Sequence, residues 1–186
     1  MDPLLDLTIA GALAVLFAAS TAHELAALGE WPGVVRNYRV LPQALTLPAA
    51  GMLLIAGAVT AAALLWPSTR RLGACAAAAQ LLLFGAAMAI NLRRGRLSID
   101  CGCFGSRLRQ GISAWMVARN LTLALLALSL LLSARPRELG MLDIATAVGV
   151  VATVSFLYPV LDVVLRPSPA TFAENFEAAE AARQAH

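Results

Sequence analysis

The chain has 186 residues, of which 60% are hydrophobic and 13% are charged, and its formal net charge is +3. A mean hydropathy of +0.76 excludes an ordinary water-soluble domain, because soluble domains carry about 25% charged residues. The composition therefore predicts an integral membrane protein. Its apolar residues form stretches separated by arginine, proline and glycine, and a bilayer span needs about 20 mostly apolar residues.

The first apolar stretch covers residues 4–22, and the polar pair His23 and Glu24 follows it directly. Secretory signal peptides begin with basic residues, whereas this chain begins with Asp2 and Asp6 and has no Lys or Arg in that region. We therefore expect the first stretch to stay in the mature chain as a transmembrane helix.

Two stretches without any charged residue follow, at 44–66 and 72–92. The connection between them is short, which predicts antiparallel neighbouring helices. The fourth stretch, 114–134, begins after Ser113, a residue type that favours the N-cap position of a helix. The fifth stretch covers residues 139–165.

Residues 166–186 have the composition of a soluble segment, and Thr171 with Glu174 has the spacing of a capping box. Backbone groups in lipid must be satisfied within their own segment, so spans of this length are helices. The sequence thus predicts an all-α fold: a polytopic membrane bundle with a four-helix core, a fifth transmembrane helix and a short C-terminal amphipathic helix. One transmembrane domain, 1–165, would precede the tail, 166–186.

The chain has three cysteines, and two of them, Cys101 and Cys103, lie in a polar loop between the third and fourth spans. Alternation of the spans places this loop, the loop after the first span and the C-terminal tail on one side of the membrane. Cys75 lies near the start of the third span, roughly 25 Å from the far end of that helix. We therefore expect Cys75 to pack as a small apolar residue and not to join the loop pair.

The Cys-Gly-Cys spacing favours chemistry within the pair. A disulfide needs Cα atoms about 4.4 to 6.8 Å apart, and two extended residues span nearly 7 Å, so the segment must turn, which Gly102 permits. The strain in so tight a bridge makes it easier to reduce, as is typical of exchanging pairs. Neighbouring arginines should favour the thiolate. A passive staple and a two-cysteine metal site are the alternatives, although zinc usually takes four ligands.

The cysteine segment resembles that of the MauE family of methylamine utilisation membrane proteins. The resemblance rests on Gly95-Arg96, Ile99-Asp100-Cys101-Gly102-Cys103-Phe104-Gly105, Arg119-Asn120, Asn37-Tyr38 and Leu41-Pro42. It covers roughly residues 4–132, and the helical remainder is also similar to the DoxX-like group of membrane bundles. The family often has a lysine near the end of the first span and an acidic residue in the second. Here the first position carries His23-Glu24 and the second span has no acidic residue.

The resemblance implies a membrane thiol-disulfide exchange protein. It would assist the maturation of exported disulfide-containing enzymes, methylamine dehydrogenase or similar ones, together with a thioredoxin-like, MauD-like partner. Cys101 and Cys103 would be its redox pair. Whether such a protein counts as a thiol-disulfide oxidoreductase stays open. The expected location is the cytoplasmic (inner) membrane, with several passes through the lipid bilayer.

Two further residues join the cysteines as predicted catalytic residues. Arg119 lies about 9 Å along its helix from Ser113, and a charge at such a depth marks a functional candidate. It could approach the cysteine loop, pair with Glu24 or extend towards the lipid headgroups. His23 could act as the base that ionises a cysteine, or simply end a helix at the interface. No cofactor and no metal is predicted, and no nucleic-acid partner.

The arginines outside the spans are unevenly distributed. The cysteine side has Arg36, Arg39, Arg93, Arg94, Arg96, Arg107, Arg109, Arg166 and Arg183, against Arg70, Arg71, Arg135 and Arg137 on the other side. The positive-inside rule therefore places the cysteine loop in the cytoplasm. A role with exported enzymes places it outside, where disulfides persist, and the sequence leaves both orientations open.

Two other functions remain possible from the residues alone. One is a non-enzymatic scaffold in which the loop is a docking surface for a partner, with Trp31 and Tyr38 as anchors. The other is transport of a small hydrophobic molecule or quinone, for which the polar residues Gln80, Asn91 and Asn120 inside the spans are the support. Polar residues in membrane helices often only bond neighbouring helices.

Overall fold

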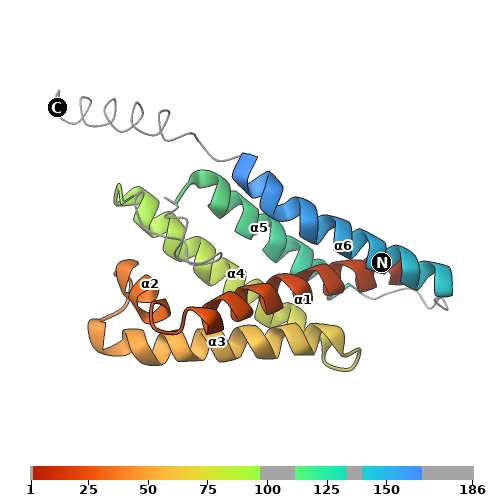
Figure 1. Ribbon diagram of the computed structural model, residues 1–186, viewed down its shortest axis with the longest axis horizontal. Helices are drawn as coiled ribbons and strands as arrows, with labels where there is room; N and C mark the ends of the chain where they lie inside the picture. The colour runs from red at the N-terminus through yellow and green to blue at the C-terminus, as the bar shows by residue number, and fades with distance from the viewer. Residues whose placement is uncertain (1, 97–111, 133–139, 165–186) are drawn as a thin grey trace.

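The computed structural model describes residues 2–96, 112–132 and 140–164. Cys101, Cys103 and the tail at 166–186 lie outside the described residues. Within these ranges the chain is all-helical, which confirms the predicted fold class (Figure 1). The helices are α1 (Pro3–Ala26), α2 (Trp31–Asn37), α3 (Gln43–Leu65), α4 (Arg70–Arg93), α5 (Ala114–Ser129) and α6 (Met141–Val164).

Helices α1, α3 and α4 are long and apolar enough to cross a membrane, and α5 and the Met141–Leu157 part of α6 are shorter apolar helices. The chain is therefore a multi-pass membrane protein. The predicted spans 44–66 and 72–92 agree with α3 and α4 within the usual uncertainty of helix ends. α1 is longer than predicted, because the helix continues through His23 and Glu24 to Ala26.

α1 begins where its first residues predict a helix start. Asp2 is the N-cap, and its Oδ1 accepts a hydrogen bond of 2.8 Å from the backbone N–H of Leu4. Pro3 occupies the first helical position, where a missing N–H costs nothing because that group has no partner inside the helix.

α5 is shorter than the predicted span 114–134. It has 16 residues, about 24 Å of helix, and ends at Ser129. The backbone N–H groups of the next residues donate to carbonyls three positions back, for example Leu130 to Ala127 and Leu132 to Ser129. Such bonds tighten the last turn of a helix and end it. Ser113 is the N-cap as predicted, but its side chain makes no capping hydrogen bond.

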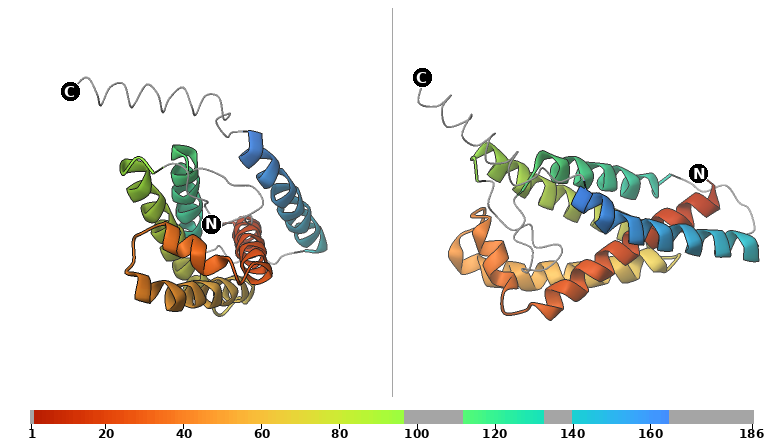
Figure 2. Two further views of the ribbon diagram at one scale, coloured as in Figure 1. Left: turned by 60° about the vertical axis from the view of Figure 1, so that its left-hand side comes forward. Right: turned by 45° about the horizontal axis from the view of Figure 1, so that its top comes forward.

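The helices pack in a fixed order of neighbours. α4 lies along α5 and α3, α1 lies along α3 and α6, and α2 packs on α3. Figure 2 shows α4 and α5 side by side and α6 beside α1. α6 packs mainly on α1 and makes few contacts with α5 over their described residues.

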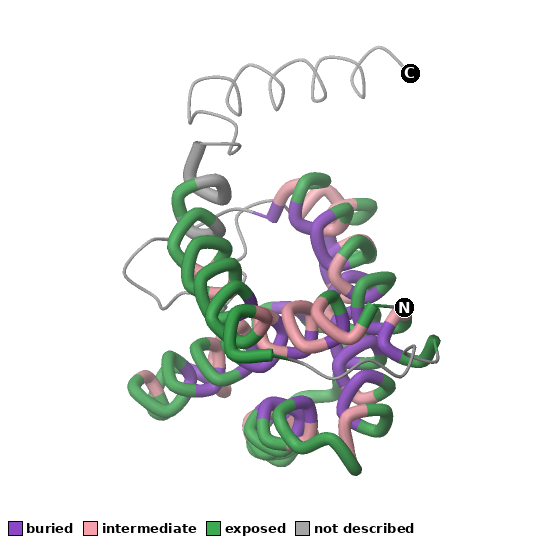
Figure 3. Tube along the Cα trace, turned by 90° about the vertical axis from the view of Figure 1, so that its right-hand side faces the viewer, coloured by how far each residue is buried: buried purple, intermediate pink, exposed green. Residues whose placement is uncertain are grey.

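The core between α1, α3, α4 and α5 consists mainly of alanine. The buried cluster comprises Ala10, Leu13, Ala14, Phe17, Ala61, Leu64, Ala74, Ala77, Ala78, Leu81, Ala124, Ala127 and Leu130. Small side chains let helix backbones approach closely, which is how membrane helices gain packing energy. Figure 3 shows the buried residues on the facing sides of these helices, whereas α6 is mostly exposed.

At the end of the bundle that holds the α3–α4 connection, the backbones of α3 and α4 approach closely, and an ion pair joins α4 to α1. A Cβ atom on Gly73 would lie 2.8 Å from the backbone nitrogen of Leu64, so only glycine fits there. Nη1 of Arg70 lies 2.6 Å from Oδ2 of Asp6 in α1, and its Nε donates to the Leu64 carbonyl. The charged residue that interrupts the first apolar stretch is thus paired.

Candidate functional site

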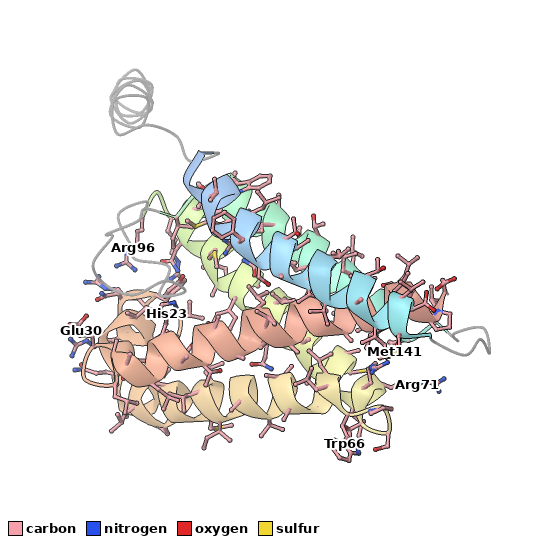
Figure 4. All side chains as sticks on the ribbon, turned by 45° about the vertical axis from the view of Figure 1, so that its right-hand side comes forward. His23, Glu30, Trp66, Arg71, Arg96 and Met141 are labelled. Atoms are coloured by element: carbon pink, nitrogen blue, oxygen red, sulfur yellow. The ribbon has the colours of Figure 1, made fainter. Side chains whose placement is uncertain are left out.

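The residues that flank the cysteine loop lie at the same end of the bundle as the connection after α1. Figure 4 shows His23, Glu30 and Arg96 at one end, and Trp66, Arg71 and Met141 at the other. This arrangement confirms that the loops after the first and third spans begin on one side. Cys101 and Cys103 themselves fall between Arg96 and Ile112, outside the described residues.

Asn91 holds the start of this loop against the rest of the bundle. Its side chain is fully buried, and its Nδ2 donates hydrogen bonds to the carbonyls of Tyr38, at 3.0 Å, and Ala87, at 2.9 Å. Its Oδ1 accepts a hydrogen bond of 3.3 Å from Nη1 of Arg96, whose backbone N–H donates to the Asn91 carbonyl. One buried amide therefore connects α4, the α2–α3 connection and the first residues of the loop.

The other flank of the loop is anchored by apolar packing. Ile112 is 1% exposed, and it forms a buried cluster with Tyr38, Met88 and Met116. Both ends of the cysteine segment are therefore attached to the same end of the bundle. No sequence pattern predicts this cluster, because its members come from three separate segments.

The first connection contains a helix that the sequence analysis did not predict. In α2, the Nε1–H of Trp31 donates a hydrogen bond of 3.0 Å to the Ala50 carbonyl in α3. Trp31 and Tyr38 are only 7% and 8% exposed. The expectation that these two side chains are docking anchors is therefore wrong, because neither is accessible to a partner. Proline at the second position of α2 is a helix-start signal that could have revealed this element.

A cavity of about 330 Å³ opens inside the bundle. Its walls come from α1, α4, α5 and α6, with Trp31 of α2, and they are mainly apolar. The apolar lining consists of Ile9, Ala12, Leu13, Val15, Leu16, Phe17, Ala19, Leu81, Phe84, Leu123, Leu126 and Val154. The polar and aromatic lining consists of Thr8, Ser20, Glu24, Trp31, Arg119, Asn120 and Ser155.

Four polar side chains of the cavity lie at the end nearer the cysteine loop, whereas Thr8 and Ser155 lie farther along it. Ser20 and Glu24 lie in the last turns of α1, and Arg119 and Asn120 lie in the second turn of α5. The hydroxyl of Ser20 donates to Oε1 of Glu24 at 3.2 Å. Nδ2 of Asn120 donates to the Met116 carbonyl at 2.9 Å.

Arg119 and His23, the two predicted catalytic residues that the structure describes, have different environments. Arg119 is 8% exposed and lines the cavity together with Glu24, which is also 8% exposed. Of the three positions that the sequence left open for Arg119, this burial contradicts the one among the lipid headgroups. His23 is exposed, although the next residue, Glu24, faces inwards. The structure brings Arg119 and Glu24 to one cavity and leaves His23 outside it.

Cys75 is a free cysteine on an exposed face of α4. It lies near the start of that helix, and its side chain faces outwards and not into the core. Over the residues that the structure describes, no group of three or more His, Cys, Asp or Glu side chains could hold a metal ion.

Comparisons with known proteins give a consistent result. The family model for "Methylamine utilisation protein MauE" matches residues 2–133. The chain is 42% identical to the methylamine utilization protein MauE of Paracoccus denitrificans over 153 residues, 78% of this chain and 82% of that protein. It is 36% identical to the protein of that name from Methylophilus methylotrophus over 168 residues, 88% of this chain and 87% of the other. No solved structure matches significantly. The chain therefore belongs to the MauE family of methylamine utilisation proteins.

Proposed function

We propose that this chain is a membrane thiol-disulfide exchange protein whose working pair is Cys101 and Cys103. It assists the maturation of exported, disulfide-containing enzymes that act in methylamine utilisation, in the inner membrane and beside a thioredoxin-like partner. The observation that carries the proposal is the anchoring of both flanks of the cysteine segment, through Arg96 and Ile112, at one end of the bundle. A pair used for exchange needs such a fixed presentation to its partner.

The exchange takes place in two balanced steps. The thiolate of one loop cysteine attacks a sulfur of the partner's disulfide, forms a mixed disulfide and releases the partner's second sulfur as a thiolate. The other loop cysteine then attacks the mixed disulfide, so the loop pair becomes oxidised and the partner is fully reduced. The same intermediate is used in the opposite direction when the partner's thiols are oxidised. The positive charge of Arg119 stabilises the thiolate. His23, the exposed residue that precedes the cavity-lining Glu24, acts as the base that takes up the thiol proton.

Single cysteine substitutions test this proposal. Cys101→Ser or Cys103→Ser leaves one loop thiol that cannot resolve the mixed disulfide, so a covalent complex with a thioredoxin-like protein should accumulate and be detected by non-reducing electrophoresis. Cys75→Ser is the matched control, because Cys75 is a free and exposed cysteine, and it should trap nothing. If neither loop variant traps a partner and both sustain enzyme maturation, the loop is a passive scaffold and the exchange proposal is wrong.

Labelling in intact cells resolves the orientation. A membrane-impermeant maleimide applied from each side, before and after reduction, should react with Cys101 and Cys103 from one side only, and only in the reduced state. Positive residues favour the cytoplasmic side, whereas the proposed clients favour the exported side. A loop pair that stays oxidised through repeated rounds of maturation would contradict exchange.

A further inference from the structure

The cavity is accessible from the membrane, because its walls include side chains that are also exposed on the outside of the bundle. Leu126 of α5 is 41% exposed and Val154 of α6 is 46% exposed, and both line the cavity. Over the described residues these two helices make few contacts with each other. A molecule dissolved in the lipid could therefore enter between α5 and α6.

We propose that this cavity is a binding site for a quinone, a lipid-soluble ring compound with carbonyl oxygens. The ring and the first part of its chain lie against the apolar walls, and one carbonyl oxygen faces the polar end formed by Ser20, Glu24, Arg119 and Asn120. The binding site consists of described residues alone and includes no part of the cysteine segment.

The size of the cavity fits a substituted ring. An engineered apolar cavity of about 150 Å³ binds benzene, and this cavity, at about 330 Å³, is roughly twice as large. It therefore has room for a ring with small substituents and the beginning of an apolar chain. The open side between α5 and α6 leaves the rest of the chain in the lipid.

The charges at the polar end favour a neutral head. Glu24 and Arg119 supply one acidic and one basic group, and both are about nine-tenths buried. A phosphate or carboxylate head would be repelled by Glu24, and an ammonium head by Arg119, in a setting where water screens little. A carbonyl oxygen carries no net charge and accepts hydrogen bonds from guanidinium or amide N–H groups. We therefore favour an uncharged head over the charged heads of phospholipids and fatty acids.

Quinone binding would supply the oxidant for the proposed exchange reaction, and this role of the quinone rests on the proposed function. When exchange delivers the loop pair in its reduced form, oxidation of the two thiols to one disulfide releases two electrons and two protons. A quinone that becomes a quinol takes up two electrons and two protons, so the reaction balances. Because the cavity's polar end and the flanks of the loop share one end of the bundle, electron transfer needs no relay across the membrane.

Photolabelling of the full-length protein in phosphatidylcholine nanodiscs tests the binding. The probe is a decyl benzoquinone with an azido group, and the labelled peptides are mapped by mass spectrometry. We expect labels on cavity-lining residues of α1, α5 or α6, competed by unlabelled decyl benzoquinone and not by decylbenzene, which lacks the carbonyl groups. Equal competition by decylbenzene, or labelling confined to the lipid-facing surface, would overturn the proposal.

Matched variants on α5 sharpen the test. Leu123→Trp fills the cavity and should weaken binding by about tenfold or more, equivalent to about 1.4 kcal/mol. Leu125→Trp is the control, because Leu125 is 68% exposed and does not line the cavity. If Leu123→Trp does not fold, Leu126→Trp replaces it, since that position is partly exposed. Equal affinities for the cavity and control variants would refute the site.

Two more variants separate this proposal from the exchange proposal. Asn120→Leu removes a polar side chain from this end of the cavity and should weaken quinone binding by about fivefold. A double Cys101→Ser/Cys103→Ser variant should bind quinone unchanged. Failure of the single Cys101→Ser and Cys103→Ser variants to trap a partner therefore bears on exchange alone, whereas absence of quinone labelling in the unmodified protein bears on the cavity alone.

Discussion

Replacement of Asn91 by leucine should loosen the cysteine loop. Leucine has the same number and branching of side-chain heavy atoms as asparagine but no hydrogen-bonding atoms, and its methyl groups are bulkier, so the fully buried position stays filled. The substitution removes the bond from Nδ2 to the Tyr38 carbonyl and the bond from Arg96 to Oδ1. The first connects α4 to the α2–α3 connection, and the second fixes the residue that leads into the loop.

The expected loss of stability is modest. Interhelical hydrogen bonds in membrane proteins contribute about 0.6 kcal/mol on average and up to about 1.7 kcal/mol. The buried Tyr38 carbonyl also loses this donor, which adds to the loss because an unsatisfied buried group costs about 1–3 kcal/mol. We therefore expect a total destabilisation of about 1–3 kcal/mol. Loss of the hydrogen bond to Arg96 should lower the free energy of local opening of the loop by about 1 kcal/mol, which raises the population of the opened loop about fivefold.

Two measurements check these values. Unfolding in lipid bicelles, followed by steric trapping, gives the change in stability. The alkylation rate of reduced Cys101 and Cys103 by an impermeant maleimide reports the local opening, and it should rise about fivefold in Asn91→Leu. The Cys75→Ser background removes the remaining cysteine, which is exposed and would react as well.

Gln80→Leu is the control for global destabilisation. Gln80 is also a buried amide of α4, and its Nε2 donates a hydrogen bond of 2.6 Å to Thr60 in α3. Its loss should lower stability by a similar amount, but it lies away from the residues that flank the loop. Equal alkylation rates in Asn91→Leu and Gln80→Leu would refute the reasoning that Asn91 positions the loop.

The remaining predictions concern the opposite end of the bundle, measured by the same unfolding assay. Gly73→Ala should destabilise the protein by about 1–3 kcal/mol, because the added Cβ meets backbone atoms that cannot move aside. Gly51→Ala, where nothing lies within 4 Å, should leave stability unchanged or raise it by up to about 1 kcal/mol, and an equal loss in both variants would contradict the packing argument. Asp6→Asn should cost about 1–3 kcal/mol by leaving Arg70 without its carboxylate partner. In a double-mutant cycle with Arg70→Gln the two losses should not add, and strict additivity would show that the ion pair is worth nothing.

The long helices could be predicted from sequence because the physics that selects them is local. The charge-free stretches at 44–66 and 72–92 became α3 and α4 with shifts of one or two residues, since lipid leaves a backbone no alternative to the helix. The shortened end of α5 could not be predicted, because apolar leucines continue past Ser129. The turn there is set by backbone bonds that composition does not reveal.

The candidate site was only partly predictable for a similar reason. Arg119 was found because a charge inside an apolar stretch is conspicuous in any membrane sequence. Asn91 was noted only as a polar residue within a span, and its contacts with Tyr38 and Arg96 bring together segments far apart in the chain. The burial of Trp31 could not be foreseen either, since an aromatic residue in a connection is as typical of the membrane interface as of a core.

The alanine-rich core has a consequence for how this protein can change over time. Eight of the thirteen buried residues in the main cluster are alanines, so almost any replacement there adds volume between backbones already in close contact. Most substitutions in this core therefore destabilise the protein by overpacking. In a leucine-rich core, most substitutions destabilise it by leaving cavities. Substitutions by larger side chains should be tolerated best on the lipid-facing surface and at the walls of the cavity. The walls of the cavity are thus an interior place where larger side chains can be accommodated.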